Sequence, residues 1–178
     1  IVILYRFMKV EWRLSFLLII SILALLTFWN YQNRVYDWDM PGYMGCMYTS
    51  EFPDSPDKVR IITYEDIKKE APAAHYTDII GIKQWDIPRQ YFVKNTQSFT
   101  EQLPYFQIKV GYILVITLFY KLGFTAPMAV LFTSLISYFI SGLLLFYILK
   151  LLFPKKYGLA IVLTIAAMLL PPMTYMSR

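Results

Sequence analysis

The residues best suited to chemistry lie in one stretch, Tyr36-Asp37-Trp38-Asp39-Met40-Pro41-Gly42-Tyr43. It places two carboxylates two residues apart, with the Tyr43 phenol about one helical turn after Asp39. A carboxylate so placed can accept a proton from a reacting hydroxyl group. Asp39 directly precedes the short helix that Pro41 predicts, so we favour it as the catalytic residue over Asp37, which we expect in the preceding turn. Asp is also a favoured N-cap residue, and an N-cap role for Asp39 is compatible with a catalytic one.

The position of this stretch along the chain points to the surface of a membrane. Immediately before it, Leu14–Asn33 is a run of twenty residues without a charge, which is long enough to cross a bilayer as a helix. Trp29, Tyr31 and Trp38 are typical of the aromatic belt where a span meets water. Carboxylates held so close to hydrocarbon are costly, and they usually have a function.

The composition indicates a membrane protein. The sequence is 57% hydrophobic and 18% aromatic, and its mean hydropathy is +0.46, far from the values of ordinary soluble domains. Eleven of its twelve acidic residues lie between Asp37 and Glu101, so residues 30–108 carry a net negative charge. That charge argues against a nucleic-acid partner. One Cys and one His cannot build a metal site of the usual Cys/His type.

Three further apolar runs follow, and their lengths predict the topology. Val110–Tyr120 has eleven uncharged residues, whereas residues 122–149 and 157–177 have 28 and 21. Eleven residues are short for a span and suit an interfacial or re-entrant helix. If this run does not cross, Lys150, Lys155 and Lys156 fall on the cytoplasmic side together with Arg6, Lys9 and Arg13. If it does cross, giving four spans, those three lysines fall outside, against the positive-inside tendency, so we favour three spans.

We therefore predict an all-α, polytopic membrane protein with three crossings and a large, mostly helical extracytoplasmic loop after the first span. Residues 1–33 form a basic flank and the first transmembrane helix, 34–123 form the loop with its interfacial helix, and 124–178 form two further transmembrane helices and the start of a second outer loop. Within the loop we expect helices that open near Met40, open at Thr63–Asp66, and cover Arg89–Asn95. Because the loop has few long apolar runs, we expect its aromatic residues to pack onto the spans or the interfacial helix; these are Trp85, Tyr91, Phe92 and Phe99.

This topology brings three charged residues from distant parts of the chain to one membrane interface, namely Asp39, Lys109 and Arg178. The two cations can hold the phosphate of a lipid-linked substrate while the carboxylate takes a proton. Alternatively, Lys109 and Arg178 only anchor helix ends by extending their charged groups toward water.

Together these features resemble the GT-C glycosyltransferases, multi-pass enzymes that use polyprenyl-phosphate-linked sugars. Relatives include aminoarabinose transferases, protein O-mannosyltransferases and the catalytic subunits of oligosaccharyltransferases. The family has an acidic residue shortly after the first span, and the stretch from Asp39 to Tyr43 resembles its aspartate-x-x-x-tyrosine form. Residues 105–123 resemble the segment that ends the first outer loop, although Val110 stands where relatives usually have proline. Residues 170–178 resemble the entry to the second outer loop.

The resemblance implies a glycosyltransferase that moves a sugar from a polyprenyl-phosphate-linked donor to an acceptor of unknown identity on the extracytoplasmic face. Asp39 is then the general base, and Tyr43, Lys109 and Arg178 bind substrate. We expect an integral, multi-pass protein of the bacterial inner (plasma) membrane, whose partners are membrane lipid and the donor, and we expect the sequence to be the N-terminal part of a longer protein. The sequence assigns no metal ligands and leaves a divalent metal open as a cofactor. The alternative is a non-enzymatic multi-pass membrane protein whose outer loop binds a partner or aids assembly.

Overall fold

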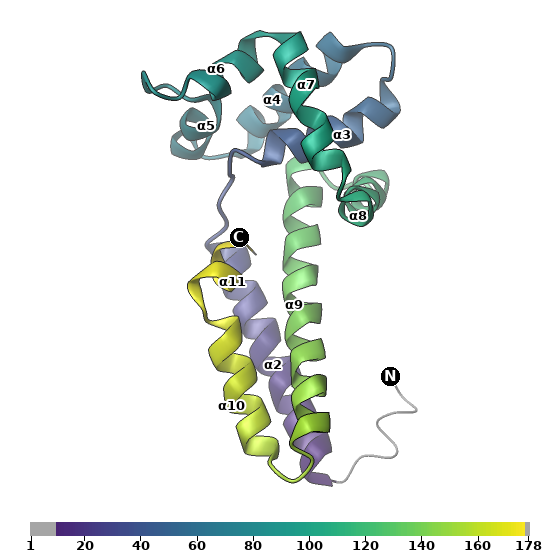
Figure 1. Cartoon of the computed structure of the whole chain (residues 1–178), viewed down its shortest axis with the longest axis vertical. Coiled ribbons are helices and arrows are strands. Elements are labelled where there is room, and N and C mark those ends of the chain that lie inside the picture. Colours follow the sequence, from purple (N-terminus) through teal and green to yellow (C-terminus); the bar gives the residue numbers. More distant parts are fainter. Residues whose placement is uncertain (1–9, 177–178) are drawn as a thin grey trace. The chain divides into compact units, whose positions relative to one another are not determined.

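The computed structural model describes residues 10–176 of the chain, and all the regular secondary structure in that range is helical. This agrees with the predicted all-α fold class. The helices are α2 (Val10–Gln32), α3 (Met40–Glu51), α4 (Pro56–Glu70), α5 (Ala73–Ile80), α6 (Ile87–Lys94), α7 (Thr96–Gln107), α8 (Val110–Lys121), α9 (Ala126–Leu152), α10 (Tyr157–Met168) and α11 (Pro171–Met176) (Figure 1).

Two of these helices, α2 and α9, are long and apolar enough to cross a membrane, which indicates a membrane protein. The predicted third span, residues 157–177, contains the shorter apolar helix α10 and the six-residue helix α11. Leu169 and Leu170 interrupt the helical path between them, directly before Pro171. Proline at the first position of α11 cannot donate the hydrogen bond that would continue α10.

The chain divides into two compact units. Unit 1 consists of residues 10–34 and 134–176, and unit 2 of residues 35–133. The first division lies close to the predicted start of the outer loop at residue 34. The second falls inside α9, whose first two turns belong to unit 2.

Unit 1 is a bundle of α2, the later part of α9, and α10 (Figure 1). Gly142 permits a close approach of α9 to α2, because a Cβ there would lie 2.5 Å from a methyl carbon of Leu23. At one end, the Trp12 indole Nε1 donates a hydrogen bond of 3.0 Å to the Pro154 carbonyl. The Lys150 ammonium also lies 6.0 Å from the Trp12 ring. The start of α2 and the α9–α10 turn therefore share one end of the bundle.

Unit 2 is built around α3, whose residues Met40 to Tyr48 are all buried. The sequence of α3 has no polar face, and a helix apolar all round must be covered on every side. It lies among α4, α7 and α8 (Figure 1). Gly42 and Gly45 face α7 so closely that a Cβ at either would overlap side chains of Phe106, or of Leu103 and Phe99. This is the close helix packing that the two glycines indicate.

Two sequence predictions for this region need correction. The helix expected to open at Thr63 begins at Pro56 instead, because Ser55 precedes Pro56 and Asp57 in a good helix start. Thr63 lies inside that helix, where its hydroxyl donates to the Val59 carbonyl at 2.7 Å.

The expectation that the aromatic residues of this segment pack onto the spans or the interfacial helix holds only in part, since unit 2 has one core to which α8 and the start of α9 contribute. Phe99 is fully buried and its ring packs on Tyr64 at 5.8 Å between ring centroids. Phe92 packs at the edge of the same core. Trp85 and Tyr91 are instead exposed, at 75% and 59%. The core that holds Phe99 contains the buried helix α3 together with Ala126 and Ala129 of the candidate span α9.

Candidate functional site

The carboxylate of Asp37 caps the N-terminus of α3. Its Oδ1 accepts hydrogen bonds from the backbone N–H groups of Asp39 and Met40, each at 3.2 Å. Burial, followed by the negative charge of Asp39, raises the pKa of the Asp37 carboxyl above its ordinary value of 3.8, although these backbone bonds oppose the shift. The capping role that the sequence offered to Asp39 therefore belongs to Asp37.

Asp39 is the residue that directly precedes α3, but its side chain makes no capping hydrogen bond. Within residues 10–176 its carboxylate has no hydrogen-bond or ion-pair partner, and it is only half-buried. The backbone at Asp39 is already helical, and its carbonyl accepts from the Tyr43 N–H at 3.3 Å. The backbone of Asp39 is thus held at the start of α3, and no described residue occupies its carboxylate.

Tyr43 and Lys109, predicted to bind the same substrate, are in direct contact. The Lys109 ammonium donates a hydrogen bond to the Tyr43 hydroxyl, and its Nζ lies 4.9 Å from the centre of that ring. Phe106 and Tyr112 hold the buried Tyr43 ring at centroid distances of 5.0 and 4.7 Å. A lysine ammonium has three N–H donors, so two remain for an anion.

The spacing along α3 places Tyr43 close to Asp39. Asp39 and Tyr43 are four residues apart, which places their Cβ atoms on one helix face and about 5–6 Å apart. Lys109 reaches the same face because α7 packs against Gly42 and the chain turns directly afterwards, with 109° between α7 and α8. The structure therefore brings Lys109 to Tyr43 from a distant segment, and Asp39 precedes Tyr43 by one helical turn. Arg178, the fourth predicted residue of this site, lies outside the described residues, as do Arg6 and Lys9.

Other side chains, which the sequence did not reveal, hold the acidic stretch in place. The Tyr36 hydroxyl donates to Glu70 Oε1 at 3.1 Å, and the Tyr36 N–H donates to His75 Nδ1 at 3.4 Å. The second Glu70 oxygen accepts from the Thr125 hydroxyl. These contacts join residues 34 to 55 positions apart, and no local pattern could have predicted them.

Trp38 is fixed in a different way, by the guanidinium of Arg89, which lies 5.4 Å from the centre of its ring. The same guanidinium donates to the carbonyl and carboxylate oxygens of Asp78 at 2.8 and 3.0 Å. The hairpin of α5 and α6 is thereby connected to the residue between the two aspartates.

Residues 10–176 contain no group of three or more His, Cys, Asp or Glu side chains that could hold a metal ion. Comparisons with protein-family models, curated proteins and solved structures find no match.

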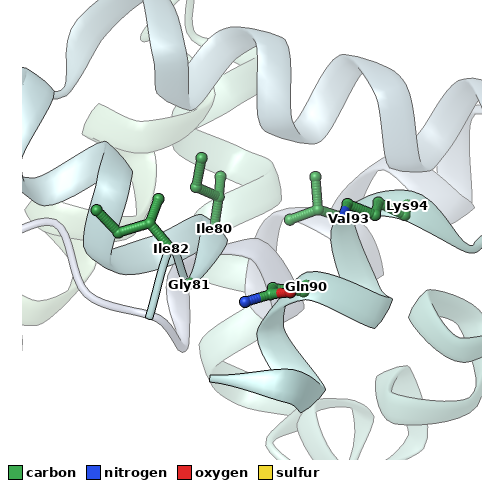
Figure 2. A pocket seen from close by; sticks show the side chains of 6 residues that line it. All are labelled: Ile80, Gly81, Ile82, Gln90, Val93 and Lys94. Atoms are coloured by element: carbon green, nitrogen blue, oxygen red, sulfur yellow. The ribbon is translucent and has the colours of Figure 1, made fainter. Parts of the chain in front are cut away.

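The hairpin of α5 and α6 also carries a separate groove, with a volume of about 310 Å³. Gly81 and its neighbours line one side of it and α6 the other, as Figure 2 shows. Gly81 ends α5 with a positive φ of 68°, which favours glycine. None of the predicted site residues lines this groove; the lining residues are Ile80, Gly81, Ile82, Gln90, Val93 and Lys94.

Proposed function

We propose that this chain acts in a membrane glycosyltransferase that moves a sugar from a polyprenyl-phosphate-linked donor to an acceptor hydroxyl. The observation that supports the proposal is that the two aspartate carboxylates have different hydrogen-bond partners. Asp37 is occupied as a helix cap, whereas the Asp39 carboxylate has no partner among residues 10–176 and lies one helical turn before Tyr43 of the Lys109–Tyr43 pair. A free base beside a cation that can bind an anion suits transfer from a phosphate leaving group.

In the proposed reaction the acceptor oxygen attacks the anomeric carbon of the donor sugar. The bond between that carbon and the phosphate oxygen breaks, and polyprenyl phosphate leaves with the bonding electrons. Asp39 takes the proton of the acceptor hydroxyl. The Lys109 ammonium stabilises the charge on the leaving phosphate, while Tyr43 holds the ammonium in place.

The membrane gives this arrangement a physical reason. A polyprenyl tail keeps the donor phosphate at the depth of the headgroups, so the base must be held close to a span. The acidic stretch follows α2, a candidate span, after only a few residues. We further propose a multi-pass protein of a bacterial inner membrane whose active face lies outside the cytoplasm, with a divalent metal left open as a cofactor.

The test is a comparison of Asp39→Asn with Asp37→Asn in full-length protein, in membranes, with folding measured separately. Loss of a general base reduces the rate by about two to four orders of magnitude, and we expect that loss for Asp39→Asn. Asp37→Asn keeps an Oδ1 acceptor for the helix cap, so its transfer rate should stay close to that of the wild type.

The opposite pattern, with Asp37→Asn inactive and Asp39→Asn active, would show that the base has been assigned to the wrong carboxylate. Unchanged transfer in both variants would remove the chemistry from this stretch. No transfer by the wild-type protein with any lipid-linked sugar would favour the alternative function, a non-enzymatic outer loop that binds a partner or aids assembly.

A further inference from the structure

Helix α8 presents two apolar faces, and unit 2 covers only one of them. Its inner face, formed by Tyr112, Ile116, Phe119 and their neighbours, packs into the core around α3. Its outer face is exposed, and the large side chains on it are Val110 at 61%, Leu114 at 64% and Leu118 at 56%. These three residues are spaced by four, so they form one stripe along the helix.

This stripe is unlike the outer surface of α4 in the same unit. Helix α4 exposes Glu65, Lys68 and Lys69 to its surroundings, in the pattern of a helix that faces water. An apolar stripe along a whole helix marks a surface that something else covers.

The way in which α8 joins α9 identifies what covers it. Only four residues separate the two helices. Ile116 of α8 and the first turns of α9, at Ala126 and Ala129, pack in one core. Because α9 is a candidate membrane span, α8 is held at the level where that span begins.

The dimensions and end charges of α8 favour a position in the plane of the membrane surface. Twelve residues of helix extend about 18 Å, whereas the hydrocarbon core of a bilayer is about 30 Å thick. Lys109 and Lys121 stand at its two ends, and both are exposed. Lysines so placed can bury their stems in the apolar layer while their ammonium groups reach the phosphates of the headgroups.

We infer that α8 is a docking surface for the bilayer itself: it lies flat in the headgroup region with Val110, Leu114 and Leu118 directed into the acyl chains. This surface holds the Lys109 ammonium, and with it the Tyr43 hydroxyl, at the depth of lipid phosphates. The inference does not depend on the reaction proposed above.

Spin labels on the full-length protein test this position. Single cysteines replace Val110, Leu114, Leu118 and Lys121 in turn, and the protein is reconstituted in vesicles of phosphatidylcholine and phosphatidylglycerol. The native Cys46 can stay, because it is buried and burial raises the pKa of its thiol to about 11. Lys68→Cys on α4 gives an aqueous reference, and Leu144→Cys on α9, which is 57% exposed, gives a hydrocarbon reference.

We expect the labels at 114 and 118 to collide frequently with oxygen and rarely with a water-soluble nickel complex, and to lie between the two references in depth. The labels at 110 and 121 should lie at the same depth as each other.

Three outcomes would overturn the inference. A depth difference close to the helix length between positions 110 and 121 would make α8 part of a broken span. Labels at 114 and 118 that behave like the label at position 68 would place α8 in water. Labels shielded from both reagents would show that protein covers the stripe. None of these spin-label measurements depends on enzymatic activity. A result that contradicts the position of α8 can therefore be distinguished from one that contradicts the proposed reaction.

Discussion

At the scale of single residues, two aspartates with the same side chain have different surroundings, and these surroundings decide the role of each. Asp37 and Asp39 are two residues apart, yet the carboxylate of Asp37 accepts two backbone hydrogen bonds while the carboxylate of Asp39 accepts none from residues 10–176. The sequence correctly predicted that Asp37 sits in the turn before α3. It could not show which carboxylate would cap the helix, because both lie within reach of the first N–H groups.

The raised pKa of Asp37 predicts a pH-dependent stability. The folded state binds the proton more tightly than the unfolded state, so the contribution of Asp37 to stability is complete below pH 3.8 and is lost as the pH rises through the raised pKa. Asp37→Asn keeps the acceptor but carries no charge at any pH. We expect the melting temperature of the variant to rise relative to that of the wild type as the pH increases from 3.8 through the raised pKa of Asp37. A difference that does not change with pH in detergent-solubilised protein would contradict this.

A second prediction concerns Lys109 and the donor phosphate. A hydrogen bond to a charged group contributes about 1.5–3 kcal/mol, so Lys109→Gln should raise the KM for the lipid-linked donor by roughly one to two orders of magnitude. Lys109→Arg keeps the charge and should recover most of the affinity. An unchanged KM in Lys109→Gln would leave Lys109 with an anchoring role only.

At the scale of elements, the packing of α7 on α3 positions the site. Phe106 covers Gly42 and also contacts Tyr43, and α7 ends just before Lys109. The distance between the two helices therefore sets where the ammonium meets the phenol. Two glycines in an otherwise bulky helix are the sequence feature that permits this approach.

Gly42→Ala tests this packing. The new Cβ would lie 2.3 Å from a ring carbon of Phe106, so α7 must move, and overpacking of this kind costs roughly 1–3 kcal/mol. We expect a lower melting temperature and reduced transfer. Gly111→Ala in α8 is the matched control, because no atom lies within 4 Å of its Cβ; alanine there should stabilise by about 0.5–1 kcal/mol. Equal stability of the two variants would show that the contact with Phe106 does not constrain α7.

The sequence predicts a helix boundary well when the residues that determine it, such as a proline or a cap, lie at that boundary. The start of α3 followed from Pro41, and the end of α4 from Pro72, since the residue before a proline avoids helical geometry. Helix α7 was missed, because Pro104 lies inside it and its cap, formed by Asn95 Oδ1 and the Ser98 N–H at 2.9 Å, is a weak pattern. The contacts of Arg89 with Trp38 and Asp78 join separate elements, and periodicity carries no information on such pairs.

At the scale of the whole molecule, the two units divide the predicted tasks. Unit 1 has the candidate span α2 and most of α9, whereas unit 2 contains the acidic stretch and a core around α3. Unit 2 is inserted between Arg34 and Ser134, so one helix of unit 1 leads into it and another leads out. A domain outside the membrane that is inserted between two spans would require this order, namely a span, the domain and a second span.

The orientation of the bundle gives the last prediction. Trp12 contacts Pro154 and Lys150, so unit 1 gathers Arg13, Lys150, Lys155 and Lys156 at one end. Because cytoplasmic loops carry an excess of Lys and Arg, we predict that this end lies inside the cell. The chain enters unit 2 after Arg34, at the other end of α2, so unit 2 is expected outside.

Single cysteines at Lys155 and at Lys68, both exposed, test this orientation in intact cells. An impermeant maleimide should label Lys68→Cys directly, whereas Lys155→Cys should react only after the membrane is opened. The buried Cys46 gives the background and is present in both variants. Labelling at 155 from outside would reverse the orientation of the bundle and place Asp39 on the cytoplasmic face. In that case the proposed donor would have to be presented there as well, and three crossings with an outer loop would no longer describe the chain.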